Sequence, residues 1–365
     1  MSTHAMNYGS WAGWDWLKAN VPVMCNWDGG IDYFLDPDDY TKKADGTNSD
    51  AANIDYAGDA MAIVKKIYKK EYKVGNDRYV YFCERKVDDD FHAVGFNVLG
   101  KERDYMLIPM FYGSIDSNGK MRSIAGQWSC LTASGSAADS ANGKAIGTAE
   151  QYTAIQAASG KALFFGGALT NTLADICILL SKSTDSQTAF GSGMCSTYVE
   201  DKAQHYGTKI NTVIGGGQFY GSNDNKSFNK IFHSCVMGSY MLWQRDPYML
   251  LINGRIKVSP DYTYDLTGAK YLDTGVNLAK NGYYATTQVV KDFGAVPNDE
   301  IACSSATGYC DHTWVNAEIT AVSLRFGACS LGADDGLWAR ALNVVAAYAW
   351  WGYGASKLLP APAAA

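Results

Sequence analysis

Histidine and cysteine are the side chains through which this chain could bind a metal or attack a substrate. Its five histidines include no HxxxH or HExxH pair, the spacing that a zinc hydrolase requires. The best local cluster is His92 beside Asp88, Asp89 and Asp90. Such a cluster could hold a metal or transfer protons, but the same string is typical of a solvated acidic loop, which is the interpretation we favour.

The nine cysteines are widely spaced, odd in number and contain no CxxC pair. This pattern argues against a disulfide scaffold and a zinc knuckle, and favours buried, reduced thiols. Whether Cys303 and Cys310 bridge a loop stays open. Cys195 lies in "FGSGMCSTY", which only faintly resembles the GxSxG nucleophile elbow. We therefore predict no catalytic residue, no metal, no cofactor and no enzymatic activity.

Composition limits the possible partners. The 365 residues are 47% hydrophobic and 19% charged, with a formal net charge of −6. The densest basic stretch, Lys65 to Lys73, is interpreted as the solvated face of an amphipathic helix over 58–70, so nucleic acid is not an expected partner. The 37 glycines predict many turns, and the 24 tyrosines and 10 tryptophans suit a binding surface.

The two ends of the chain carry further expectations. Residues 1–35 are rich in tryptophan and predict an attachment or oligomerisation element, while 36–365 form the main domain. The start of the chain shows no signal-peptide pattern. The last residues, 332–365, carry little charge, but Arg340 and Lys357 bracket a window shorter than the roughly 20 apolar residues of a membrane-spanning helix. No membrane insertion is expected.

Periodicity and turn residues predict an α+β chain with few helices, short strands and long irregular loops. Asp246-Pro247 is expected to join two strands, and Thr170 or Asn171 to cap a helix. The expected elements are a loop at 36–60, the helix at 58–70, strands at 77–87 and 104–115, a long loop at 126–150, helices at 148–165 and 170–184, and two strands within 239–259.

Residues 325–356 read "RFGACSLGADDGLWARALNVVAAYAWWGYGAS". This segment resembles the variable region of proteins diversified by retroelements, many of them phage tropism determinants. That family carries a pattern close to R-G-G-x-W-x-x-G-A-x-x-G, then Asn-bearing positions and a Gly-Ala-Arg or Gly-Ala-Ser ending. Upstream segments such as "DPDDYTKKADGTNSD" and "LINGRIKV" are also similar to proteins of this type. The residues that match the frame are Arg325, Gly327, Gly332, Ala333, Gly336, Leu342, Asn343, Gly354, Ala355 and Ser356.

The chain departs from the frame at Phe326 and Cys329, where the family has its Gly-Gly and Trp. Trp350 is a further departure, because tryptophan codons contain no adenine and adenine-directed mutagenesis of Asn codons cannot produce them. Either Trp350 is encoded by the template or the register is shifted by one. The sugar-binding motifs EPN and QPD of calcium-dependent lectins are absent.

The resemblance implies a C-type lectin-like fold of the formylglycine-generating-enzyme type, with the variable region at about 325–356 on one face. Residues between fixed glycines can change if they face solvent, and Tyr and Trp give contact area at low entropic cost. The candidate ligand-binding residues are Ala328, Ser330, Leu331, Asp334, Ala339, Ala341, Val344, Tyr348, Trp350 and Gly352.

The function implied is that of a receptor-binding protein of a phage or prophage, located at the tail tip of the virion. Its partners would be a bacterial surface protein or glycan and other tail proteins, in a homo-oligomer, trimeric or otherwise multivalent, that gains avidity. Two alternatives stay open. One is a structural virion component whose tail is buried, and the other is an oxidoreductase like the formylglycine-generating enzyme, which would need a reactive cysteine pair.

Overall fold

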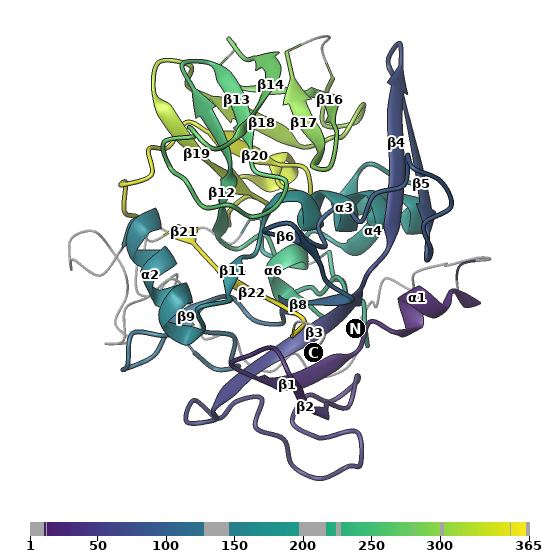
Figure 1. Cartoon of the computed structure of the whole chain (residues 1–365), viewed down its shortest axis with the longest axis vertical. Coiled ribbons are helices and arrows are strands. Elements are labelled where there is room, and N and C mark those ends of the chain that lie inside the picture. The colour runs from purple at the N-terminus through teal and green to yellow at the C-terminus, as the bar shows by residue number, and fades with distance from the viewer. Residues whose placement is uncertain are drawn as a thin grey trace.

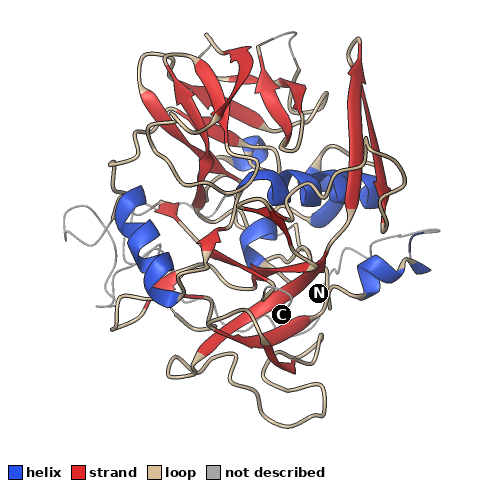
Figure 2. Cartoon of the chain, viewed as in Figure 1, coloured by secondary structure: helices blue, strands red, loops and turns tan. Residues whose placement is uncertain are grey.

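The computed structural model describes residues 11, 13–127, 146–196, 217–223, 228–279, 281–299, 303–350 and 352–362. Strands dominate this part of the chain, at 36% against 14% helix, and the sheets are curled. The fold is therefore mostly β, consistent with the α+β class (Figure 2). The described helices are α1 (Asp15–Lys18), α2 (Thr148–Ala158), α3 (Gly167–Ser181), α4 (Ser186–Phe190), α6 (Cys235–Gly238) and the 3-10 turn η3 (Gly332–Asp334).

The first sheet joins the beginning of the described chain to its end (Figure 1). Its order is β11-β22-β8-β3-β1-β2, and all its pairs are antiparallel. The C-terminal strand β22 is thus held between two neighbours, as an interior strand. The bounds are β1 (Pro22–Asn26), β2 (Ile31–Phe34), β3 (Gly58–Lys65), β8 (Tyr105–Pro109), β11 (Leu163–Phe164) and β22 (Lys357–Pro360).

The second sheet contains the C-terminal region. Its order is β14-β13-β12-β19-β20-β18-β15, and β21 pairs in parallel with the start of β12. Strand β20 pairs in parallel with β18 and antiparallel with β19. The bounds are β12 (Trp243–Ile252), β13 (Arg255–Val258), β14 (Leu272–Asn277), β15 (Tyr283–Tyr284), β18 (His312–Val315), β19 (Thr320–Arg325), β20 (Arg340–Leu342) and β21 (Tyr353–Gly354).

Four two-stranded hairpins complete the architecture, and the longest projects from the body beside α3 (Figure 1). This projecting hairpin consists of β4 (Tyr68–Val74) and β5 (Asp77–Cys83). The others are β6 (Asn97–Val98) with β7 (Lys101–Glu102), β9 (Ser114–Ile115) with β10 (Met121–Arg122), and β16 (Thr286–Val290) with β17 (Gly294–Asn298).

Helix α3 packs between the two sheets, against β12 and β17 (Figure 1). Twelve of its fifteen residues are buried, so it belongs to the core on nearly every side. The sheet face toward α3 also carries charge: Asp246 lies beside Arg325 and Arg340, with the oxygen–nitrogen distances 3.4 Å and 3.5 Å. The core at this point is therefore held by buried ion pairs as well as by apolar contacts.

The prediction of a helix over 58–70 is wrong. The segment forms β3 and the start of β4, and β3 is buried at seven consecutive positions on both faces. A continuous buried run is typical of a central strand and cannot be told from a helix by its apolar residues alone. Lys69, assigned to a solvated face, is 1% exposed, with Nζ 2.6 Å from Asp175.

Most other expected elements are present, with three corrections. The strands at 77–87 and 104–115 and the helix at 170–184 are confirmed by β5, β8 and α3, with shifted ends. The helix at 148–165 is confirmed only over α2, because residues 163–164 form strand β11. Thr170 and Asn171 do not cap α3, which begins at Gly167, whose N–H donates to Asp246 Oδ1 at 2.8 Å. Asp246-Pro247 does not join two strands either: β12 runs through it with a register shift, and the turn follows at residues 253–254.

Three further expectations concern the boundary at 35/36, the loop at 126–150 and the absence of a membrane-spanning helix. The sheet formed by β1, β2 and β3 crosses the boundary drawn at 35/36. Most of the loop expected at 126–150 lies outside the described residues. No helix in the described ranges is long and apolar enough to span a membrane.

Candidate functional site

Two glycines of the C-terminal frame lie very close to buried carboxylates. Gly327 has φ of +104°, and a Cβ there would lie 1.6 Å from Asp335 Oδ1. At Gly336 a Cβ would lie 2.2 Å from Asp311 Oδ1. A side chain at either position would require the neighbouring carboxylate to shift, and both carboxylates are buried and hydrogen-bonded, so glycine is strongly favoured.

The two aspartates that approach these glycines also hold the segment between β19 and β20. Asp335 Oδ1 accepts a hydrogen bond from the Ala328 N–H at 2.9 Å, and Asp311 Oδ2 accepts one from the Trp338 N–H at 2.7 Å. Burial raises the pKa of both carboxyl groups well above the usual range for aspartate. The segment is thus fixed by buried polar contacts at its base.

The frame residues other than glycine are also constrained by burial, with two exceptions. Arg325, Leu342, Ala355 and Ser356 are buried, and Ser356 Oγ donates to Gln244 Oε1 at 2.8 Å. Ala333 and Asn343 are exposed. Most frame positions are therefore constrained by packing, independently of any ligand.

The sheet face opposite α3 carries aromatic side chains from strand to strand. Tyr284 contacts His312 with ring centroids 5.1 Å apart, His312 contacts Trp314 at 4.2 Å, and Trp314 contacts Trp243 at 5.5 Å. Trp243 pairs through its backbone with Tyr353. We call these residues, together with Trp350 and Tyr348, the aromatic row.

The last part of the aromatic row lies in the C-terminal segment. Tyr353 contacts Trp350 with ring centroids 4.9 Å apart and Tyr348 at 5.9 Å. The Tyr348 side chain is 52% exposed, whereas Trp350 and Tyr353 are half-buried. This end of the row gives solvent access to large side chains that cost little entropy to order.

The ten candidate residues differ in their exposure to solvent. Ser330 and Tyr348 are exposed, and Leu331, Asp334 and Trp350 are half-buried. The others are buried: Ala328, Ala339, Ala341, Val344 and Gly352. Ligand binding by these ten residues stays a prediction.

Four of the buried candidates belong to one small cluster beneath the aromatic row. Ala328, Ala339, Ala341 and Val344 pack with Trp243 and Leu324, and the half-buried Trp314, Leu331 and Tyr353 cover this cluster. Ala341 pairs with Trp314 on β18 and with Leu324 on β19, so these side chains face the same side of the sheet. The candidates thus lie on the face with the aromatic row, one layer below its surface.

Asp334 lies at the other end of the row. Its Oδ1 accepts a short hydrogen bond of 2.5 Å from the Tyr284 hydroxyl. Burial, together with this contact, raises the pKa of Tyr284 to about 12. The pair ties η3 to β15 and closes this end of the face.

Arg245 anchors the segment that carries Tyr348 and Trp350. Its guanidinium donates to Thr148 Oγ1 on α2 at 2.9 Å and to the Tyr348 carbonyl oxygen, and it lies 5.6 Å from the Tyr353 ring centroid. The two hydrogen bonds point in different directions, which suits the forked geometry of arginine and not the single ammonium of lysine.

Replacing Arg245 with lysine is therefore expected to loosen this segment. Losing hydrogen bonds from a buried charged donor costs about 1.5–3 kcal/mol of unfolding free energy. Hydrogen–deuterium exchange of residues 343–350, with thermal unfolding, measures the effect. Arg255→Lys is the matched control, because Arg255 forms an exposed pair with Asp273. Equal exchange in the two variants would contradict the anchoring role.

Five residues of the aromatic row were missed by sequence reasoning: Trp243, Tyr284, His312, Trp314 and Tyr353. The only signal for two of them was the alternation in "HTWV", which predicts a strand with His312 and Trp314 on one side. The others reach the site through strand pairing between segments far apart in the chain.

The remaining candidate histidine and cysteine side chains have the following surroundings. His92 Nδ1 lies 3.1 Å from Asp292, while Lys70 pairs with Asp90. Burial raises the pKa of the Cys195 thiol, which disfavours the thiolate needed for attack. Cys303 and Cys310 are not joined by a disulfide. Within the described residues, no three His, Cys, Asp or Glu side chains converge as metal ligands.

Comparison with known proteins adds no assignment. No family model matches the chain, and no curated protein matches it.

Proposed function

We propose that this chain is a receptor-binding protein of a phage or prophage, with a C-type lectin-like fold, that recognises a bacterial surface ligand through the face carrying the aromatic row. The observation that carries the proposal is the contrast within residues 325–356. Side chains at positions 327 and 336 would collide with Asp335 and Asp311, whereas Ser330 and Tyr348 are exposed between and beyond these glycines. A fixed frame with changeable positions is what a diversified binding surface requires.

The aromatic row supports binding to a macromolecule. Tyrosine and tryptophan dominate the binding energy of protein interfaces, and rings held by neighbours lose little freedom on binding. Tyr353 is held between Trp350, Tyr348 and Arg245, so its ring is already ordered. A ligand at this end of the row would meet a preformed surface.

The buried alanines extend the proposal. Ala328, Ala339 and Ala341 lie beneath the half-buried Trp314 and Tyr353. A larger residue at any of them would displace these rings outward. Substitutions in this layer would therefore reshape the binding surface without touching the ligand directly.

Deep sequencing of the 3′ end of the gene in a phage or lysogen population tests the proposal. Substitutions are expected to concentrate at adenine-bearing codons between Ala328 and Gly352, with Gly332, Gly336 and Gly354 unchanged. Codons 60–120 provide the internal control. A C-terminal region no more variable than that control would contradict diversification and favour a structural virion component.

A further inference from the structure

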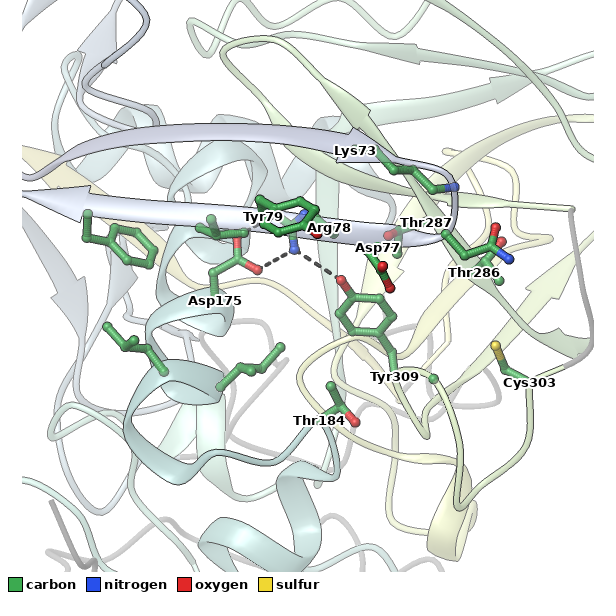
Figure 3. Close-up of a pocket in the computed structure, with 16 residues that line it drawn as sticks. Lys73, Asp77, Arg78, Tyr79, Asp175, Thr184, Thr286, Thr287, Cys303 and Tyr309 are labelled. Carbon is green, nitrogen blue, oxygen red and sulfur yellow. Dashed lines mark hydrogen bonds and ion pairs between the residues drawn. The ribbon is translucent and has the colours of Figure 1, made fainter. Parts of the chain in front are cut away.

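A cavity of about 670 Å³ lies between the β4–β5 hairpin, α3 and the segment 303–309, away from the aromatic row. Figure 3 shows Arg78 and Tyr79 above it, Asp175 beside it, and Tyr309 and Cys303 on the opposite wall. The half-buried Ile178 and Leu179 of α3 provide apolar lining. This volume falls within the usual range of ligand pockets.

The cavity follows the outer edge of β5. Its lining includes five residues of that strand, Asp77–Val80 and Phe82, and these alternate between the two faces of the hairpin. A hollow over one face would meet every second residue only. In the described part of the chain, β5 pairs with β4 and with no other strand. Within the described residues, its second edge is therefore unpaired.

The backbone groups at this edge point into the cavity. Lys69 on β4 exchanges both of its backbone hydrogen bonds with His92, at 2.8 Å and 3.0 Å, and so cannot exchange them with Phe82 opposite. Hydrogen-bonded and non-hydrogen-bonded pairs alternate along antiparallel strands. Val80 and Arg78 follow Phe82 at two-residue steps, so all three direct N–H and C=O groups away from β4.

The charges around the cavity are balanced. Arg78 donates to Asp175 on both oxygens, to Glu71 and to the Tyr309 hydroxyl, so its guanidinium is already satisfied. Lys73 and Asp77 carry opposite charges near the hairpin turn. The site offers backbone hydrogen bonds and apolar surface, with no excess charge to select an ion.

We propose that the edge of β5 binds an extended peptide segment of a partner protein by strand addition. The peptide backbone pairs with Arg78, Val80 and Phe82. Every second side chain of the peptide contacts Ile178 and Leu179 and is apolar. The intervening side chains lie beside Tyr79 and Tyr81, which are 40% and 45% exposed on the outer hairpin face. This proposal does not depend on the function of the face that carries the aromatic row.

Selection from a random heptapeptide library on the full-length protein tests it. The selected peptides are expected to carry apolar residues at alternate positions and to lose at least tenfold in affinity for Val80→Pro. Proline removes an N–H at the free edge and leaves the hairpin bonds of β4 intact. Tyr348→Ala is the matched control and is expected to bind the peptides as the wild type does, because Tyr348 belongs to the aromatic row.

Amide exchange followed by NMR keeps the proposal testable if Val80→Pro does not fold. Saturating wild-type protein with a selected peptide is expected to slow exchange at Arg78, Val80 and Phe82, and to leave Tyr79 and Tyr81 unchanged. Failure to enrich any peptide, equal binding to Val80→Pro, or protection without this alternation would overturn the proposal. A wild-type dimer that Val80→Pro abolishes would also overturn it, in favour of pairing between two copies.

Discussion

Replacing Asp246 with asparagine is expected to lower the unfolding free energy by about 3–5 kcal/mol, the usual cost of breaking a buried ion pair from one side. Asp246 Oδ2 lies 3.4 Å from Arg325 and 3.5 Å from Arg340, and all three side chains are at most 2% exposed. Its Oδ1 also accepts the N–H of Gly167, where α3 begins. Asparagine preserves the size of the side chain and removes its charge, leaving two buried guanidinium groups without this carboxylate.

Urea unfolding at pH 7 measures the loss. Asp273→Asn is the matched control: Asp273 accepts from Arg255 at 2.7 Å, but the pair is exposed, and exposed pairs contribute about 1 kcal/mol or less. If the two variants lost similar amounts, the compensation of Arg325 and Arg340 by Asp246 would be disproved. Arg325 ends β19 and Arg340 begins β20. Asp246→Asn is therefore also expected to loosen the segment between them, which contains Gly327.

The helices were predictable where sequence pattern and local packing agree. The segments of α2 and α3 are rich in alanine and leucine, which favour helices, and both helices overlap the expected ranges. The segment at 58–70 failed because burial on both faces removes periodicity from β3. The start of α3 failed for another reason: Asp246, which caps it, is about 80 residues away in the sequence. Local capping rules cannot anticipate a partner brought in by the tertiary fold.

The positions of the close-packed glycines in the candidate site could be predicted from the sequence, but the burial of the candidate alanines could not. Glycine spacing indicated fixed turns, and the contacts at Gly327 and Gly336 supply the physical reason. Alanine, however, carries no signal for exposure, and Ala339 and Ala341 turn out to be covered. The cover comes partly from Trp314 on β18, whose position depends on the parallel pairing of β18 with β20. Such a pairing cannot be inferred from residues 325–356 alone.

A buried chain of hydrogen bonds near the first sheet predicts a strong pH dependence of stability. Lys230 Nζ donates to the Tyr40 hydroxyl at 3.1 Å, and this hydroxyl lies 2.8 Å from His233 Nδ1. His233 also forms a hydrogen bond with the backbone of Asn20. Donation from Lys230 to Tyr40 and from Tyr40 to Nδ1 leaves His233 neutral. A protonated imidazole would place a second positive charge beside Lys230.

Burial, followed by the charge of Lys230, lowers the pKa of His233 from 6.5 to about 3. The unfolded state therefore binds a proton between pH 6.5 and pH 3 that the folded state refuses. This contribution to stability is complete above pH 6.5 and is lost as the pH falls through that window. At about 1.4 kcal/mol for each pH unit, the loss approaches about 5 kcal/mol at pH 3. Urea unfolding at pH 7, 5.5 and 4.5 measures its slope.

His233→Asn isolates this effect from the carboxylates that also titrate in acid. His233 has φ of +62°, a conformation that asparagine tolerates better than most residues, and the amide can still bond Tyr40. The variant is expected to be less stable than wild type at pH 7 but to lose less stability on acidification, so that the two curves converge. A His233→Asn slope equal to that of wild type would show that folding does not lower the pKa of His233, which contradicts the direction of the hydrogen-bond chain.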